Sequence, residues 1–175
     1  MPKLMPRRSV PMLDVPTLAG ERWTAPGSPE RFALVVFYRG LHCPICRTYV
    51  GELAKLLPDF AQRGVSPIAI SSDTEERARR AQADWGLGAL PVGYGLPLER
   101  ARAWGLYVSN SRGTTSIGIE EPAQFSEPGL FLVRPDGTLY YGAVQTMPFA
   151  RPHMRDLLGG LDFAIAKDYP ARGEA

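Results

Sequence analysis

Residues 37–46 read Phe37-Tyr38-Arg39-Gly40-Leu41-His42-Cys43-Pro44-Ile45-Cys46 and carry the only two cysteines of the chain. The continuous apolar run 32–37 leads into them, as expected for a central β-strand covered on both faces. Beyond Pro44 the apolar residues recur every three or four positions, which predicts a helix that begins at the cysteines. These positions are Cys46, Val50, Leu53, Leu57 and Phe60. Two cysteines at this spacing, between a strand and a helix, are typical of a redox-active dithiol.

Length and composition indicate one globular domain over residues 1–175. A chain of 175 residues with 45% hydrophobic residues is long enough to bury a core without disulfide bonds. Residues 1–31 are rich in Pro, Gly and Ser, and we expect an N-terminal arm with a small hairpin around Ala19-Gly20. The 20 basic and 18 acidic residues leave a net charge of +2, so no nucleic-acid partner is expected.

Pro6 and Pro11 interrupt any apolar run that could form the core of a signal peptide, and no stretch is apolar enough to span a membrane. We therefore expect a cytoplasmic protein with no membrane contact. In a reducing compartment a cysteine pair is a cycling dithiol more often than a permanent crosslink.

The remaining patterns alternate between strand and helix. Strands are predicted over 65–71, 91–94, 130–133 and 139–144, and helices over 97–104 and 154–165. A further helix is expected to begin with a capping box, Asp73 followed by Glu76, and to end at Gly86. Residues 106–128 are predicted to form a long surface loop. The resulting order, β-α-β, a helical middle and β-β-α, matches a thioredoxin-like α/β fold with a central mixed β-sheet flanked by helices.

The position of the two cysteines favours different roles for them. Cys43 is expected at the amino end of the helix, where unpaired N–H groups and the helix dipole stabilise a thiolate. Cys46 follows one turn later on about the same face and can attack an adduct formed on Cys43. Arg39, His42 and Arg47 concentrate positive charge around the pair, although each could equally be solvated or simply packed in the turn.

Two other interpretations of the cysteines are open. They could be inert core thiols, since free cysteine is often buried. They could hold zinc, but a structural zinc site needs four ligands and His42 and His153 are the only histidines. No glycine-rich phosphate loop follows a strand. We expect no cofactor and no metal.

With these residues in view, the chain resembles the thioredoxin-like superfamily, and within it the peroxiredoxin-like AhpC/TSA (redoxin) family. The resemblance covers nearly the whole length. It is carried by the segments 32–38, 43–46, 68–73, 97–106 and 128–137. The resemblance implies that Pro128 is a cis-proline lying against the dithiol.

The chain departs from the peroxiredoxin pattern Pro-x-x-x-Thr/Ser-x-x-Cys. Arg39 stands at the proline, Cys43 at the Thr/Ser and Cys46 at the peroxide-reducing cysteine. Glu127-Pro128 stands where the family has an arginine, so a guanidinium that activates peroxide has to come from elsewhere, with Arg39 as a candidate. The thioredoxin pattern makes Cys43 the attacking residue and the peroxiredoxin pattern makes it Cys46. We expect Cys43, because it should be the more exposed.

Together these observations predict a thiol-disulfide oxidoreductase, or peroxiredoxin-like antioxidant protein, that cycles a Cys43-Cys46 dithiol. Its substrate would be a peroxide or a protein disulfide, and its partner an external thiol reductant of the thioredoxin or glutathione type. A homodimer is left open. The alternative is a non-catalytic, redox-responsive interaction module in which residues 106–128 contact a partner.

Overall fold

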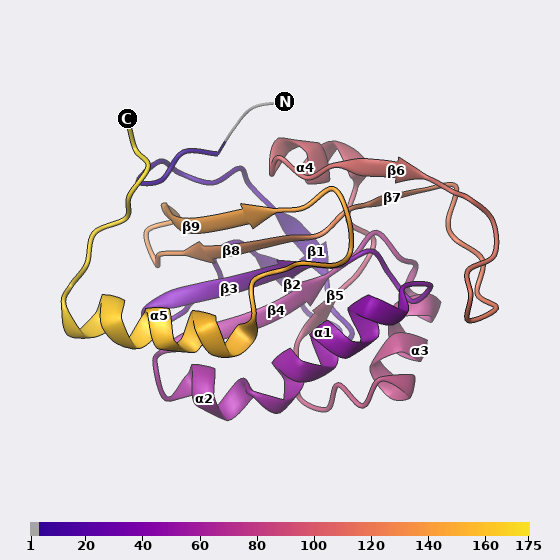
Figure 1. The fold of residues 1–175 in the computed structure, drawn as a ribbon, viewed down its shortest axis with the longest axis horizontal. Helices are drawn as coiled ribbons and strands as arrows, with labels where there is room; N and C mark the ends of the chain where they lie inside the picture. Colours follow the sequence, from indigo (N-terminus) through magenta and orange to yellow (C-terminus); the bar gives the residue numbers. More distant parts are fainter. Residues whose placement is uncertain (1–3) are drawn as a thin grey trace.

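The computed structural model describes residues 4–175, so the first three residues of the expected N-terminal arm lie outside it. A five-stranded sheet in the order β5-β4-β3-β8-β9 forms its centre. Its strands are β3 (Phe32–Phe37), β4 (Val65–Ile70), β5 (Val92–Gly93), β8 (Gly129–Val133) and β9 (Leu139–Val144). β3 is parallel to β4 and antiparallel to β8, which makes the sheet mixed, as predicted (Figure 1).

Helices lie on both faces of the sheet. They are α1 (Pro44–Lys55), α2 (Leu57–Ala61), α3 (Glu75–Asp84), α4 (Leu98–Ala103) and α5 (Met154–Ala166). In Figure 1, α1 and α5 lie across one face, and α4 lies on the other side. The arm contributes the predicted hairpin, β1 (Asp14–Pro16) paired with β2 (Arg22–Thr24).

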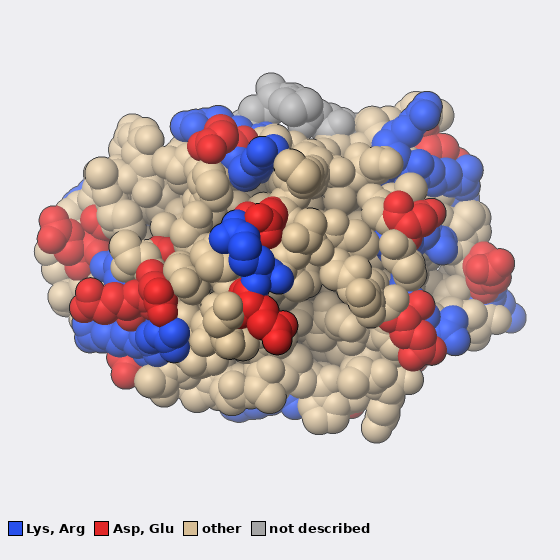
Figure 2. All heavy atoms as spheres, turned by 180° about the vertical axis from the view of Figure 1, so that it is seen from behind, with Lys and Arg blue, Asp and Glu red and all other residues tan. Residues whose placement is uncertain are grey.

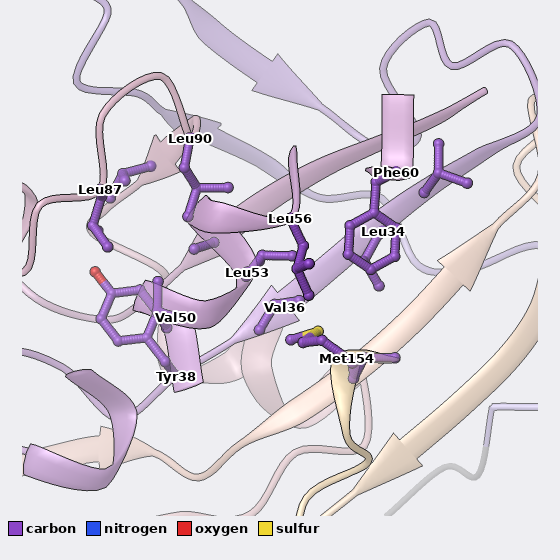
Figure 3. Packing of buried hydrophobic residues seen from close by; sticks show 14 of the residues in the cluster. Leu34, Val36, Tyr38, Val50, Leu53, Leu56, Phe60, Leu87, Leu90 and Met154 are labelled. Atoms are coloured by element: carbon purple, nitrogen blue, oxygen red, sulfur yellow. The ribbon is translucent and has the colours of Figure 1, made fainter. Parts of the chain in front are cut away.

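The central strand β3 is buried along its whole length, and its side chains alternate between two hydrophobic cores. Leu34 and Val36 pack in the core beneath α1, α2 and α5 (Figure 3). Val35 and Phe37 pack on the opposite face, against α4 and the arm. The absence of polar alternation in the sequence of this strand therefore follows from burial on both faces.

The helix predicted to begin at the cysteines does begin there, at Pro44. Cys43 is the N-cap of α1, Pro44 occupies the first turn, and α1 ends at Lys55. Pro58 lies in the first turn of α2, where a missing N–H costs no helical hydrogen bond. Gly64 then takes a positive φ of 68° in the turn to β4.

Two expectations about the middle of the chain are wrong. The N-cap of α3 is Thr74, whose hydroxyl accepts from the Arg77 N–H, because the carboxylate of Asp73 is turned inward to the dithiol turn. The predicted surface loop 106–128 contains an antiparallel hairpin, β6 (Val108–Asn110) paired with β7 (Gln124–Ser126). These strands are only three residues long, too short for a periodicity that the sequence could reveal.

Figure 2 shows acidic and basic side chains interspersed on the face opposite to that of Figure 1, with no extended field of one sign. This distribution agrees with the near-neutral composition. None of the helices in residues 4–175 is long and apolar enough to cross a membrane.

Candidate active site

The turn between β3 and α1 holds both cysteines as free thiols. Cys43 Sγ accepts the Cys46 N–H at 3.2 Å, as expected of a residue that caps the helix. Cys43 is 2% exposed and Cys46 has no exposed surface. Exposure therefore separates the two residues far less than the sequence suggested, and their roles depend on the groups that surround each sulfur.

Arg151 contacts the sulfur of Cys46. Its Nη2 donates to Cys46 Sγ at 2.9 Å, and its Nε donates to the Pro148 carbonyl at 2.8 Å. The guanidinium also stacks over the Tyr49 ring, 4.6 Å from the centroid, and the Tyr49 hydroxyl donates to the Pro152 carbonyl at 2.7 Å. Tyr49 thus ties the segment between β9 and α5 to α1, and this tie places the guanidinium beside the thiol.

These contacts shift the pKa values of the two cysteines in opposite directions. Burial opposes ionisation of Cys46, but the Cys43 thiol and the positive charge of Arg151 outweigh it and lower the pKa of Cys46 to about 7. The backbone N–H of Arg39 adds to this effect. The hydrogen bond to Cys46, together with burial, raises the pKa of Cys43. Near pH 7, about half of Cys46 is therefore thiolate, whereas Cys43 retains its proton.

Arg39 lies beside the dithiol but its side chain is committed to the hairpin. Its Nε is 3.4 Å from Glu127 Oε2, its Nη2 is 3.7 Å from Glu121 Oε1, and its guanidinium stacks on the Phe125 ring at 4.7 Å. Ser109 donates to the other Glu127 oxygen at 2.6 Å. Two carboxylates balance the charge of Arg39, so Arg151, rather than Arg39, supplies the guanidinium at the sulfur.

His42 is buried against Phe125, with ring centroids 4.6 Å apart, and its Nδ1 lies 3.4 Å from Arg77 Nη2. Burial and the charge of Arg39 lower its pKa to about 4, so the ring is neutral at neutral pH. His42 therefore adds no positive charge to the site, contrary to the sequence expectation.

Asp73 fixes the turn that carries the cysteines. Its carboxylate accepts the Leu41 N–H at 2.7 Å and pairs with Arg77 Nε at 2.9 Å. Gly40 has a φ of 133°, and a Cβ there would lie 2.7 Å from the Asp73 oxygens. The close approach of turn and carboxylate therefore requires glycine.

Two sequence candidates lie differently from expectation. Arg47 is exposed on α1 and lines a separate surface groove with Lys55 and Trp85. Pro128 is buried beside β8, but its peptide bond is trans, since Ala25–Pro26 is the cis bond of the described residues. The cis-proline expectation is therefore wrong for this chain.

A recess of about 380 Å³ opens beside the cysteines. Cys43, His42 and Ile45 line it from the dithiol turn, and residues 112–116 line it from the tip of the β6–β7 hairpin. Cys46 does not line it. A molecule that enters the recess therefore meets Cys43 first. No cluster of three or more potential metal ligands occurs in residues 4–175.

Sequence reasoning missed Arg151, the residue with the strongest effect on the site. It is one arginine in the turn-rich segment Pro148-Phe149-Ala150-Arg151-Pro152, and no spacing rule links it to a cysteine 105 positions away. Asp73 was noticed only as a helix cap. Pro148 and Pro152 flank Arg151 and are the signal that this segment holds a fixed conformation.

Comparisons with known proteins show what this chain is similar to. The family model described as "AhpC/TSA family" matches residues 6–142. AhpC of Mycobacterium tuberculosis superposes with a TM-score of 0.73 at 18% identity, over 96% of each chain. Peroxidoxin BcpB of the same organism gives a TM-score of 0.70 at 16% identity, over 92% of this chain and 98% of that one. Peroxiredoxin Q of Xanthomonas campestris gives a TM-score of 0.67 at 21% identity, over 86% of this chain and 90% of that one. A comparison with curated protein sequences gives no significant match. The structural matches confirm the predicted thioredoxin-like fold.

Proposed function

The chain belongs to the AhpC/TSA family, and from this premise we propose that it is a thiol-dependent peroxidase that cycles Cys43 and Cys46 between dithiol and disulfide. The observation that carries the proposal is the 2.9 Å contact between Arg151 Nη2 and Cys46 Sγ. A guanidinium beside a thiol favours its thiolate form, and the thiolate is the form that attacks.

In the first step the Cys46 thiolate attacks one peroxide oxygen. An S–O bond forms as the O–O bond breaks, Cys46 becomes a sulfenic acid, and the leaving oxygen takes up a proton to depart as water or an alcohol. The Cys43 thiol then attacks the sulfenic sulfur, which forms the Cys43-Cys46 disulfide and releases water. Two electrons from an external thiol restore the dithiol.

The burial of Cys46 favours a peroxide over a protein disulfide as its oxidant. Cys46 has no exposed surface, and a peroxide needs a much smaller local opening of the turn to reach its sulfur than a protein disulfide does. This assignment reverses the expected order of attack, since the sequence favoured Cys43 for its position at the amino end of the helix and for its expected exposure. Cys43 becomes the resolving residue because it keeps its proton and caps the same helix.

Thiol titration after mixing the reduced protein with hydrogen peroxide tests the proposal. The wild-type protein should lose two thiols per chain. Cys43→Ser should stop at a sulfenic acid on Cys46 that dimedone traps, and Cys46→Ser should react no faster than free cysteine. Equal reactivity of Cys46→Ser and wild type would overturn the assignment of roles.

A second function, disulfide reduction, is favoured by one observation: Cys43, rather than Cys46, lines the recess. A disulfide substrate would form its mixed disulfide with Cys43, and Cys46→Ser would accumulate that adduct. Insulin reduction faster than peroxide consumption would favour this function. If neither oxidant reacts faster than with a free-thiol control, the non-catalytic interaction module is the better explanation, and partner binding should then survive replacement of both cysteines by serine.

A further inference from the structure

The recess beside Cys43 is larger than hydrogen peroxide requires. Its volume is about 380 Å³, whereas a water molecule occupies about 30 Å³ in the liquid and a peroxide is of similar size. Binding sites for small organic molecules begin at about 300 Å³. The recess therefore has room for a molecule of tripeptide size in addition to the oxidant.

The hairpin supplies the polar wall of this recess. Residues 112–116 read Arg-Gly-Thr-Thr-Ser and bring hydroxyl groups and a guanidinium to its rim. Glu121 also lines the recess, but it is engaged: one oxygen faces Arg39 Nη2 at 3.7 Å and the other accepts the Arg112 backbone N–H at 2.7 Å.

The charges that face the recess leave one cation without a counter-ion. Arg39 is already paired with Glu121 and Glu127, whose two negative charges exceed its single positive charge, and His42 is neutral. Within residues 4–175 the exposed side chain of Arg112 makes no ion pair. Arg112 is therefore available to bind an anion in the recess.

The sulfurs of the oxidised pair are not equivalent to an incoming thiol. Cys43 lines the recess and Cys46 does not. Thiolates attack a disulfide at the accessible sulfur, and the exchange is faster when the departing thiol is the more acidic one. Attack on Cys43 expels Cys46, whose thiolate is stabilised by Arg151 at 2.9 Å. Access and leaving-group stability thus select the same sulfur.

From these contacts we propose that the recess binds the reductant of the enzyme, a small thiol that carries a carboxylate, with the carboxylate held by Arg112 and the thiolate directed at Cys43. The proposal rests on the peroxidase cycle above and names its electron donor. Arg112 acts as a residue that determines the specificity for the donor.

The reduction balances with two molecules of thiol. The first thiolate attacks Cys43 Sγ, so that a mixed disulfide forms and the Cys43-Cys46 bond breaks, with Cys46 leaving as the thiolate. The second thiolate attacks the sulfur of the bound donor, which releases the donor disulfide and leaves Cys43 to take up a proton. Two electrons pass from the two thiols to the protein.

The test starts from the preformed Cys43-Cys46 disulfide, which diamide generates without any peroxide. Stopped-flow measurements would follow its reduction by glutathione, 3-mercaptopropionate, 2-mercaptoethanol and cysteamine. The rates are corrected for the intrinsic nucleophilicity of each thiol through its pKa. The two anionic thiols should lie above the common correlation and cysteamine below it.

The substitution Arg112→Gln should lower the rates with the anionic thiols by up to about fivefold, the upper end of the range expected for an exposed ion pair. It should leave 2-mercaptoethanol unchanged. Arg102→Gln is the matched control, because Arg102 is an exposed arginine on α4 outside the recess. Mass spectrometry of the wild-type protein, quenched with acid early in the reduction of its disulfide by glutathione, should place the tripeptide on Cys43 rather than on Cys46.

Three results would overturn the inference: rates ordered by thiol pKa alone, equal effects of Arg112→Gln and Arg102→Gln, or reduction only by a protein dithiol such as thioredoxin. None of them bears on the peroxidase step, which is measured separately from peroxide consumption by the reduced protein. Failure of the donor assignment and failure of the proposed function are therefore distinguishable.

Discussion

Replacement of Arg151 by methionine tests the central claim about the site, that a residue distant in the sequence sets the acidity of Cys46. Methionine keeps much of the buried volume and removes the donor 2.9 Å from Cys46 Sγ. A hydrogen bond to a charged group contributes about 1.5–3 kcal/mol. At 1.36 kcal/mol for each pKa unit, its loss should raise the pKa of Cys46 by about one to two units.

Starting from a pKa of about 7, the thiolate fraction of Cys46 at pH 7 is about one half. After the substitution it should fall to roughly one in ten to one in a hundred. The rate of peroxide reaction at pH 7 should fall by a factor of about 5 to 50, since only the thiolate reacts. At pH 10 the loss should be much smaller, because both proteins are then largely ionised.

The rate of iodoacetamide alkylation as a function of pH measures this change, with fragment ions assigning the label to Cys43 or Cys46. Arg155→Met is the matched control, an exposed arginine in the first turn of α5, four residues further along the chain. Arg151→Lys should give an intermediate midpoint, because it keeps the charge but loses the planar contact. A midpoint near 7 in Arg151→Met, with circular dichroism like that of wild type, would refute the reasoning and assign the acidity to Cys43 and the backbone N–H of Arg39.

Three further predictions concern the surroundings of the dithiol. The pKa of His42 is lowered to about 4 in the folded state, so the unfolded chain binds more protons than the folded protein between about pH 6.5 and 4. The free energy of unfolding should therefore fall as the pH drops through this window, by up to about 3 kcal/mol. Urea unfolding measures this dependence, and His42→Phe should lack it. Gly40→Ala should destabilise the protein by about 1–3 kcal/mol, because Gly40 has a positive φ and a Cβ there would clash with Asp73. Gly159→Ala is the control: it lies in α5 with nothing within 4 Å of the added Cβ and should stabilise the protein by up to about 1 kcal/mol. Equal shifts of the melting temperature in the two variants would contradict this. Arg39→Met leaves the buried Glu127 carboxylate without its charged partner. We expect the free energy of unfolding to fall by about 3 kcal/mol and proteolysis within residues 108–126 to become faster. Unchanged proteolysis would show that the hairpin is held by other contacts.

The local patterns of the sequence predicted most of the scaffold. The unbroken apolar run of β3, the period of α1 and the proline and glycine signals around them each reflect interactions between near neighbours in the chain. The β6–β7 hairpin was predicted as a loop, because strands of three residues are too short to show a periodic pattern. Nothing in the sequence indicated that the tip of this hairpin lies beside Cys43.

The turn 38–46 shows the division between what the sequence determines and what the fold decides. The sequence alone fixed that two thiols stand one helical turn apart behind a buried strand, because the strand, Gly40 and the Pro44 helix start depend on local backbone preferences. Which thiol ionises was decided by tertiary structure. Arg151 is 105 positions from Cys46 in the sequence, but its guanidinium contacts the Cys46 sulfur in the folded protein. A Coulomb interaction depends on distance in space and on the exclusion of water, and the spacing of residues along the chain determines neither.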